Sequence, residues 1–159
     1  KTEADLIISI RFGLILHQEA IATAKLGVIN LHSGILPNYK GVMATFWAMK
    51  NREKNIGTTL HYIQDSKIDS GDILRISQRE VDYQRSYLWN VLQLYPQGCR
   101  DIISAVNELS ANEKLCHQAQ EAGGHYYSFP SERDIKTFQE QGNTLFDNDD
   151  VLSLLQENA

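Results

Sequence analysis

Val28-Ile29-Asn30-Leu31-His32, followed by the loop-forming residues 33–41, is the most informative stretch of the sequence. The first five residues have the apolar, β-branched character of a short strand, and the glycines and proline after them predict a loop. Asn30 and His32 are two positions apart, so their side chains leave the same face of the strand. They also lie where the strand ends. Ligands of open α/β sheets bind beyond the carboxyl ends of the strands, so we expect a binding site here.

Strand-like and helix-like segments alternate on both sides of this stretch. Further strands are expected at 6–10, 57–63 and 71–81, and helices at 14–25, 42–50 and 83–109, the last interrupted by Pro96 and Gly98. This alternation predicts an α/β fold with a mainly parallel sheet and flanking helices.

The run at residues 6–10 is continuously apolar, which predicts a strand buried on both faces. Such a strand needs neighbours on both edges, so we expect a sheet that is incomplete at its N-terminus. Residues 1–111 are expected to form the main core and residues 112–159 a C-terminal extension. In that extension Ser131 should cap a short helix, and the acidic tail from Asn143 should pack loosely.

The composition excludes several classes of function. The chain has 159 residues, 42% hydrophobic and 22% charged, with a net charge of −5. These values are typical of one globular domain and disfavour a nucleic-acid partner. No apolar run approaches the length of a membrane span, so we expect no membrane partner and a cytoplasmic location. The two cysteines and five histidines show no metal-ligand spacing, so no metal site is expected.

Asp69 is the third candidate catalytic residue, beside Asn30 and His32. It lies in the loop between the two later strands. An amide and an imidazole aimed at one point can stabilise a developing oxyanion, and a nearby carboxylate can assist proton movement. The alternative is structural, because Asn and His at a strand end are often satisfied by local turn hydrogen bonds. Convergence of the three side chains on one cleft would favour the catalytic interpretation.

Three blocks of the sequence resemble the formyltransferase family, which includes glycinamide ribonucleotide transformylase, methionyl-tRNA formyltransferase and the sugar N-formyltransferases. The first block follows the family pattern N-x-H-x-S-L-L-P-x-[YF]-x-G, and the second follows G-x-T-x-H and then D-x-G-x-I. The third is weaker and matches the segment whose backbone lines the folate pocket. In this chain the blocks are Asn30 to Gly41, Gly57 to His61 with Asp69 to Ile73, and Phe12 to Leu16.

The resemblance implies a Rossmann-like formyltransferase fold, of which residues 1–111 would be a partial catalytic core. Asn30 and His32 would bind the formyl oxygen of 10-formyltetrahydrofolate, and Asp69 would assist proton transfer. His61 would shape the loop or pack near Asp69, as a strand histidine in the wall of the site. The folate would be held by a larger group of residues: Phe12, Gly13, Leu14, Leu16, Ser66, Lys67 and Ile68.

The implied activity is formyl transfer to the amine of a small molecule, such as an amino sugar, a sugar nucleotide or an amino-acid derivative. Hydrolysis of the same donor and a non-catalytic folate-binding or regulatory module are the alternatives. The chain departs from the family pattern in having Gly34 where a serine is usual and one extra residue between His61 and Asp69. The expected partners are the small-molecule amine and either a second copy of the chain or a missing N-terminal segment.

Overall fold

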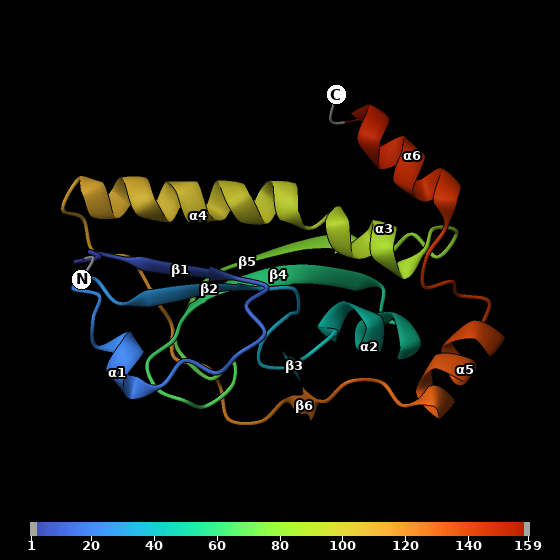
Figure 1. Ribbon diagram of the computed structural model, residues 1–159, viewed down its shortest axis with the longest axis horizontal. Coiled ribbons are helices and arrows are strands. Elements are labelled where there is room, and N and C mark those ends of the chain that lie inside the picture. The colour runs from blue at the N-terminus through green and yellow to red at the C-terminus, as the bar shows by residue number, and fades with distance from the viewer. Residues whose placement is uncertain (1–2, 158–159) are drawn as a thin grey trace.

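A computed structural model describes residues 3–157, and a four-stranded sheet lies at its centre (Figure 1). The strand order is β1-β2-β4-β5, with bounds β1 (Ile7–Ile10), β2 (Val28–His32), β4 (Asn55–Tyr62) and β5 (Ile73–Glu80). The predicted α/β class is confirmed. The expectation of a mainly parallel sheet is wrong for the described residues, because only β1 and β2 run parallel while β2–β4 and β4–β5 are antiparallel. The long polar loop before Gly71 acts as a hairpin connection, which reverses the chain without a crossover helix.

Successive side chains of β2 point to opposite faces of the sheet, and the two faces have different roles. Ile29 and Leu31 are buried against α4 (Tyr95–Ser110), which runs along one face of the sheet (Figure 1). Leu31 approaches Gly98 so closely that a Cβ at this glycine would lie 2.7 Å from the leucine side chain. Asn30 and His32 therefore face the other side of the sheet, as the two-residue spacing predicted.

Short elements cover the face of the sheet opposite α4 (Figure 1). They are α1 (Gln18–Ile21), α2 (Ala44–Lys50) and a two-stranded parallel sheet of β3 (Tyr39–Gly41) and β6 (His125–Tyr127). The helix expected at 14–25 is reduced to the single turn of α1, because Leu14 and Ile15 are exposed and Ile21 is the only buried residue of this segment, so it gains little packing energy. Tyr127 stacks on Tyr39 and on Trp47, which ties the C-terminal region to the main core.

Strand β1 differs from the prediction in its burial. Ile8 and Ile10 are 41% and 42% exposed, whereas Ser9 between them is buried beside β2. Among the described residues β1 pairs with β2 alone, so it is an edge strand of this sheet. The continuous apolar run misled the prediction because it does not distinguish a strand covered on two faces from one covered on a single face.

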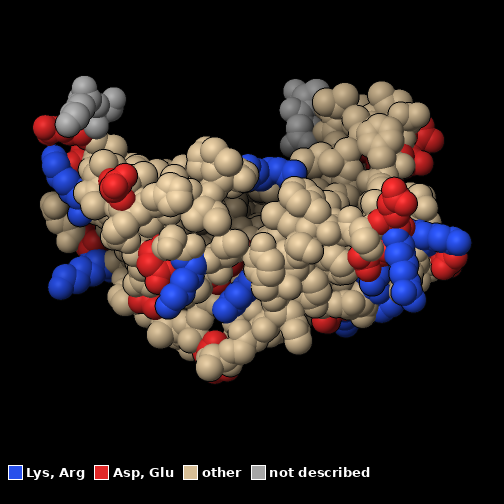
Figure 2. Space-filling model, turned by 60° about the horizontal axis from the view of Figure 1, so that its bottom comes forward, with Lys and Arg blue, Asp and Glu red and all other residues tan. Residues whose placement is uncertain are grey.

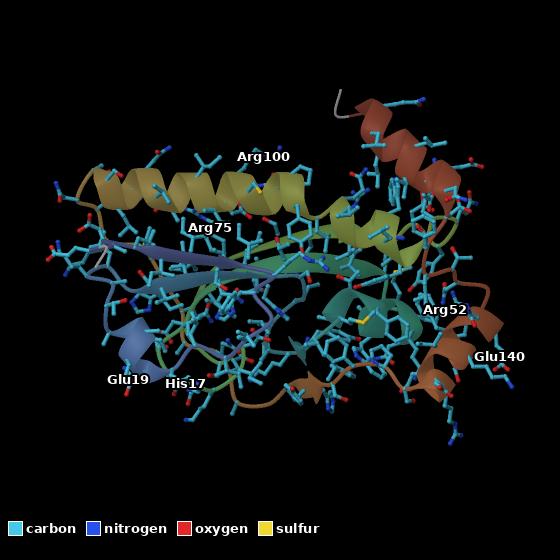
Figure 3. The ribbon with its side chains drawn as sticks, viewed as in Figure 1. His17, Glu19, Arg52, Arg75, Arg100 and Glu140 are labelled. Carbon is cyan, nitrogen blue, oxygen red and sulfur yellow. The ribbon has the colours of Figure 1, made fainter. Side chains whose placement is uncertain are left out.

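The helical segment expected at 83–109 is two helices, α3 (Tyr87–Leu92) and α4. The break lies just before Pro96, which occupies the first turn of α4, where a missing backbone N–H does no harm. Arg75 of β5 donates a 2.6 Å hydrogen bond to the Asp101 carbonyl and pairs with Glu108, so it joins the sheet to α4 (Figure 3). The break before Pro96 confirms the predicted interruption of the helical segment.

The C-terminal region packs more firmly than predicted. Helix α5 (Glu132–Glu140) begins with the expected Ser131 cap, and Phe138 on its inner face is fully buried against α2. In α6 (Asn148–Glu157), Asp150 is only 4% exposed. Its carboxylate accepts hydrogen bonds from Arg85 and from the Ser86 backbone N–H at 2.9 and 2.6 Å. The acidic tail is thus held to the start of α3 by a buried carboxylate.

The surface carries both signs of charge. Acidic and basic side chains are interspersed on the face in Figure 2, without a broad basic area. None of the helices formed by residues 3–157 is long and apolar enough to cross a membrane.

Candidate active site

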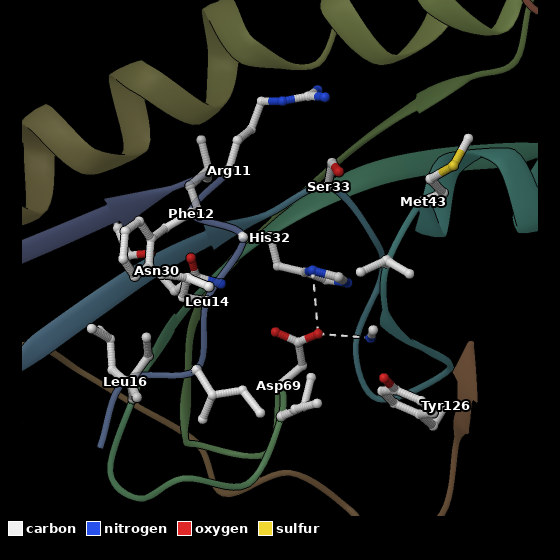
Figure 4. A pocket seen from close by; sticks show the side chains of 18 of the residues that line it. Arg11, Phe12, Leu14, Leu16, Asn30, His32, Ser33, Met43, Asp69 and Tyr126 are labelled. Carbon is white, nitrogen blue, oxygen red and sulfur yellow. Dashed lines mark hydrogen bonds and ion pairs between the residues drawn. The ribbon is translucent and has the colours of Figure 1, made fainter. Parts of the chain in front are cut away.

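A cleft of about 370 Å³ opens where β1 and β2 end (Figure 4). All three predicted catalytic residues, Asn30, His32 and Asp69, contribute to its wall. The wall also includes every residue expected to hold the folate: Phe12, Gly13, Leu14, Leu16, Ser66, Lys67 and Ile68. The sequence blocks thus converge on a single cavity.

His32 lies at the end of β2 with both ring nitrogens near protein oxygens. Its Nε2 lies 2.7 Å from the Tyr39 carbonyl oxygen, which can only accept a hydrogen bond, so Nε2 carries a hydrogen. Its Nδ1 faces Asp69 Oδ2 at 3.5 Å (Figure 4). In the neutral ring Nδ1 bears a lone pair, and in the charged ring it donates toward the carboxylate. Nδ1 can therefore accept a proton on the side that faces the Asp69 carboxylate.

Asp69 is held in position by its backbone conformation and by hydrogen bonds from two other segments of the chain. Its backbone has a φ of 47°, a left-handed conformation that few non-glycine residues adopt. The Gly41 N–H donates a 2.8 Å hydrogen bond to Oδ2, and the Gln120 side chain donates to the Asp69 carbonyl at 3.0 Å. The extra residue between His61 and Asp69 therefore does not turn the carboxylate away from the cleft.

His61 joins the group from the neighbouring strand. It is paired with Asn30 in the β2–β4 register, so both project from the same face of the sheet. Its Nδ1 lies 2.8 Å from the Tyr62 carbonyl and therefore carries a hydrogen. Its Nε2 lies 3.1 Å from Asn30 Nδ2 and 3.4 Å from Asp69 Oδ1. His61 thus packs beside Asp69, which is one of the two arrangements considered from the sequence.

Sequence reasoning did not predict the contact of His61 with Asn30, because that contact depends on strand register. A pair of antiparallel strands can bring residues that are far apart in the chain directly opposite each other. The Asn30–His61 contact could have been predicted only by placing β4 antiparallel beside β2. In that arrangement Asn30 and His61 are cross-strand neighbours. The expected parallel arrangement concealed that relationship.

Burial and charge oppose each other in the His32–Asp69 pair. Burial lowers the pKa of His32 below its ordinary value, although the Asp69 carboxylate and the Tyr39 hydrogen bond act in the opposite direction. Burial alone would raise the pKa of Asp69. The nearby His61 and His32 rings and the Gly41 N–H outweigh it, so the pKa of Asp69 is lowered. Asp69 is therefore a carboxylate at neutral pH, and burial disfavours the charged form of the His32 ring beside it.

Gly34 allows this packing. A Cβ at Gly34 would lie 2.6 Å from His32 Nε2, 2.6 Å from the Ala44 Cβ and 2.7 Å from the Tyr39 carbonyl. Any side chain there would push His32 away from Tyr39. The substitution of glycine for the usual serine is therefore a packing requirement in this chain.

The model of the formyl transferase family matches residues 1–87, which include β1, β2, β4, β5 and the cleft loops between them. The chain belongs to the formyl transferase family. Two methionyl-tRNA formyltransferases are among its relatives. The Fusobacterium nucleatum protein is 30% identical over 111 residues, which cover 70% of this chain and 36% of the relative. The Clostridium tetani protein is 40% identical over 82 residues, which cover 52% of this chain and 26% of the relative. The chain thus spans about a third of the length of such curated relatives.

Solved structures of formyltransferases share its fold. The formyltransferase PseJ from Anoxybacillus kamchatkensis, described in complex with UDP-4,6-dideoxy-4-formamido-L-AltNAc and tetrahydrofolate, has a TM-score of 0.66 and 26% identity. The alignment covers 86% of this chain and 69% of PseJ. The N-formyltransferase from Helicobacter canadensis, in complex with folinic acid and dTDP-3-aminofucose, has a TM-score of 0.65 and 25% identity, covering 80% of this chain and 45% of that protein. The Rossmann-like formyltransferase fold expected from the sequence is confirmed.

The cleft offers hydrogen-bonding and apolar groups but no set of metal ligands. Over residues 3–157, no group of three or more histidine, cysteine, aspartate or glutamate side chains is arranged to hold a metal ion. The apolar contribution comes from Leu14, Leu16 and Ile68, and the polar contribution from the Asn30, His32 and Asp69 side chains. An organic ligand with an apolar body and a polar reactive group matches this combination.

Proposed function

We propose that the protein transfers a formyl group from 10-formyltetrahydrofolate to the amine of a small molecule. The observation that carries the proposal is the convergence of Asn30, His32 and Asp69 in one cleft of a formyl transferase family member. The cleft volume of about 370 Å³ is within the range of small-molecule sites. In the related structures from Anoxybacillus and Helicobacter, tetrahydrofolate and folinic acid are the bound folates, which supports a reduced folate as the donor here.

The donor is held between two segments that face each other across the cleft. Phe12 to Leu16 follow β1, and Ser66 to Ile68 precede Asp69 in the β4–β5 loop. Leu14 is 74% exposed and Phe12 54% exposed, so apolar surface is available to cover a flat ring. Burying such side chains under a ligand stabilises the complex by about 25 cal/mol for each Å² of apolar surface removed from water.

Bound 10-formyltetrahydrofolate supplies the formyl carbon that the acceptor amine attacks. Asn30 donates to the formyl oxygen with the amide N–H that does not face His61, and so stabilises the negative charge that develops there. His32 Nδ1 receives the proton released by the amine, and Asp69 stabilises the resulting imidazolium at 3.5 Å. The proton then passes to the folate nitrogen as its bond to the formyl carbon breaks and the new amide bond remains.

A small amine, rather than an RNA, is the proposed acceptor. The net charge of −5 and the interspersed surface charges give no basic footprint for a polyanion (Figure 2). Of the two related structures named above, PseJ is in complex with a formamido-sugar nucleotide and the Helicobacter protein with an amino-sugar nucleotide. A sugar nucleotide is therefore the first acceptor class to test, followed by free amino sugars and amino-acid derivatives.

A turnover assay with product mass analysis tests the proposal. The protein is incubated with 10-formyltetrahydrofolate and a panel of amino-sugar nucleotides, and Asp69→Asn is the inactive comparison. The expected result is an acceptor 28 Da heavier, and about a hundredfold less of it with the variant. Formate without a formylated amine would favour the hydrolase. Donor binding without either product would favour the non-catalytic module.

A further inference from the structure

A second polar group lies in the same cleft, away from the formyl-transfer residues. Arg11 follows β1, Tyr87 begins α3 and Tyr95 begins α4, and all three contribute to the cleft wall. The Arg11 side chain extends toward α4 and away from Asp69 (Figure 4). Tyr87 and Tyr95 pack against the hydrophobic core, but the proposed proton transfer uses none of the three polar groups, so the convergence of these groups needs another explanation.

The Arg11 backbone is held in a left-handed conformation, with a φ of 51°. Two other non-glycine residues of the cleft wall, Met43 and Asp69, have φ values of 54° and 47°. Unfavourable backbone conformations of this kind cluster where a site requires a particular geometry. In Arg11 the conformation turns the chain at the end of the strand and presents the guanidinium at the rim of the cleft.

The three side chains carry more donors than acceptors. Arg11 Nη1 donates a 3.2 Å hydrogen bond to the Tyr95 hydroxyl oxygen, which leaves the phenol's own proton free. Within residues 3–157 the Tyr87 hydroxyl has no hydrogen-bond partner, and no carboxylate forms an ion pair with Arg11. The remaining guanidinium N–H groups and the two phenol O–H groups therefore have no acceptor among the described residues, and all three residues line the cleft.

These donors are firmly positioned. The Tyr87 ring packs edge-on against the buried Phe46, with ring centroids 6.2 Å apart. Burial raises the pKa of Tyr87, so its hydroxyl stays protonated and can donate at neutral pH. The Arg11 guanidinium lies 5.8 Å from the centre of the Tyr95 ring, a cation–π contact that limits its rotation. A preorganised guanidinium loses less conformational entropy for each hydrogen bond that it forms with a ligand.

We propose that Arg11, Tyr87 and Tyr95 form an anion-binding subsite that holds a phosphate group of the amine acceptor. A guanidinium fork and two hydroxyl donors match the several oxygens of a phosphate. This inference rests on the proposed formyl transfer, because it names the acceptor class of that reaction as phosphorylated amines. The glutamate carboxylates of the folate are the other anions that could reach the cleft, and the experiment separates them.

Calorimetric titration with inorganic pyrophosphate tests the subsite without any folate or turnover. Arg11→Ala and Tyr87→Phe remove donors, and Arg100→Ala is the control, because Arg100 is an exposed cation on α4 that bonds to Gln97 (Figure 3). We expect pyrophosphate affinity to fall roughly tenfold or more in Arg11→Ala and roughly two- to fivefold in Tyr87→Phe. Arg100→Ala should bind as the unmodified protein does. Circular dichroism of each variant establishes that the fold is retained.

Parallel titrations with 5-formyltetrahydrofolate show whether Arg11 binds a phosphate or the glutamate carboxylates of the folate. Folate affinity that stays unchanged in Arg11→Ala supports the acceptor subsite. The inference is overturned if the unmodified protein does not bind pyrophosphate at millimolar concentration, or if Arg11→Ala and Arg100→Ala weaken binding equally. It is also overturned if Arg11→Ala weakens folate binding alone, which would assign Arg11 to the glutamate tail. Because pyrophosphate binding needs no catalysis, its failure is distinguishable from failure of the formyl-transfer proposal.

Discussion

Asp69 Oδ2 lies 3.5 Å from His32 Nδ1, while the opposite ring nitrogen of His32 lies 2.7 Å from the Tyr39 carbonyl oxygen. The second contact determines the tautomer, and the tautomer leaves Nδ1 without a hydrogen in the neutral ring. Asp69 is therefore placed to stabilise a proton that His32 gains during the reaction.

His32→Ala is expected to remove most formyl transfer while leaving donor affinity nearly unchanged. The physical reason is that His32 acts on the proton released during the reaction and contributes little to holding the folate rings. We expect turnover to fall about a hundred- to a thousandfold. Stopped assays give the turnover, and titration with 5-formyltetrahydrofolate gives the affinity. Unreduced turnover in a folded His32→Ala protein would mean that the family motif is a structural relic here.

The stability of the protein should decrease as the pH falls below about 6.5, the ordinary pKa of histidine. Burial lowers the pKa of His32 in the folded state, so the unfolded chain binds this proton more readily. Protonation then favours unfolding between the unfolded and folded pKa values. The lowered pKa of Asp69 acts in the same direction, but only below its ordinary value of 3.8.

Urea unfolding between pH 7.5 and pH 5 measures this effect. His32→Gln, which cannot be protonated in this range, should have a shallower dependence of the unfolding free energy on pH than the unmodified protein. The other histidines are present in both proteins and cancel in the comparison. An unchanged slope in His32→Gln would contradict a lowered His32 pKa.

Gly34→Ala is expected to destabilise the fold by about 1–3 kcal/mol, the usual cost of overpacking a tight site. The new Cβ would collide with His32, Ala44 and the Tyr39 carbonyl. Gly13→Ala is the stability control, because a Cβ at Gly13 would meet nothing within 4 Å. Thermal unfolding of both variants gives the comparison, and equal stability of the two would argue against the close contact around Gly34.

Asp150→Asn should destabilise the protein by about 1.5–3 kcal/mol, the range for hydrogen bonds that involve a charged group. The substitution removes the charge that pairs with Arg85 and weakens the bond from the Ser86 N–H. Asp149→Asn, on the exposed side of α6, should change stability by less than about 0.5 kcal/mol. Chemical unfolding separates the two, and a loosely packed tail would give them the same value.

The sequence predicted the residues of the cleft better than it predicted the sheet. Asn30 and His32 could be placed together because their spacing on one strand depends only on local geometry. The hydrogen bonds of Asp69 with Gly41 and Gln120 depend on loop conformation, and the position of His61 depends on strand register. No local pattern encodes these contacts. Hydrophobicity also failed to reveal that Ile8 and Ile10 are exposed, because an apolar residue reports a preference for burial and not the presence of a covering element.

The Arg11 group was not found from the sequence for a similar reason. Its members come from the ends of three separate elements, and only the packing of α3 and α4 beside β1 brings Tyr87 and Tyr95 to the arginine. The left-handed backbone at Arg11 is likewise visible only in the folded chain.

Calorimetric titration with 5-formyltetrahydrofolate is the most direct test of the claim that the cleft around His32 and Asp69 holds a formyl-folate. We predict saturable binding at one site, weakened at least about tenfold when Leu14 is replaced by Asp, because a charge would then face the folate ring. Glu140→Gln, on the distant helix α5 (Figure 3), should bind as the unmodified protein does. Absence of heat up to high micromolar folate, in a protein shown by circular dichroism to be folded, would contradict the account.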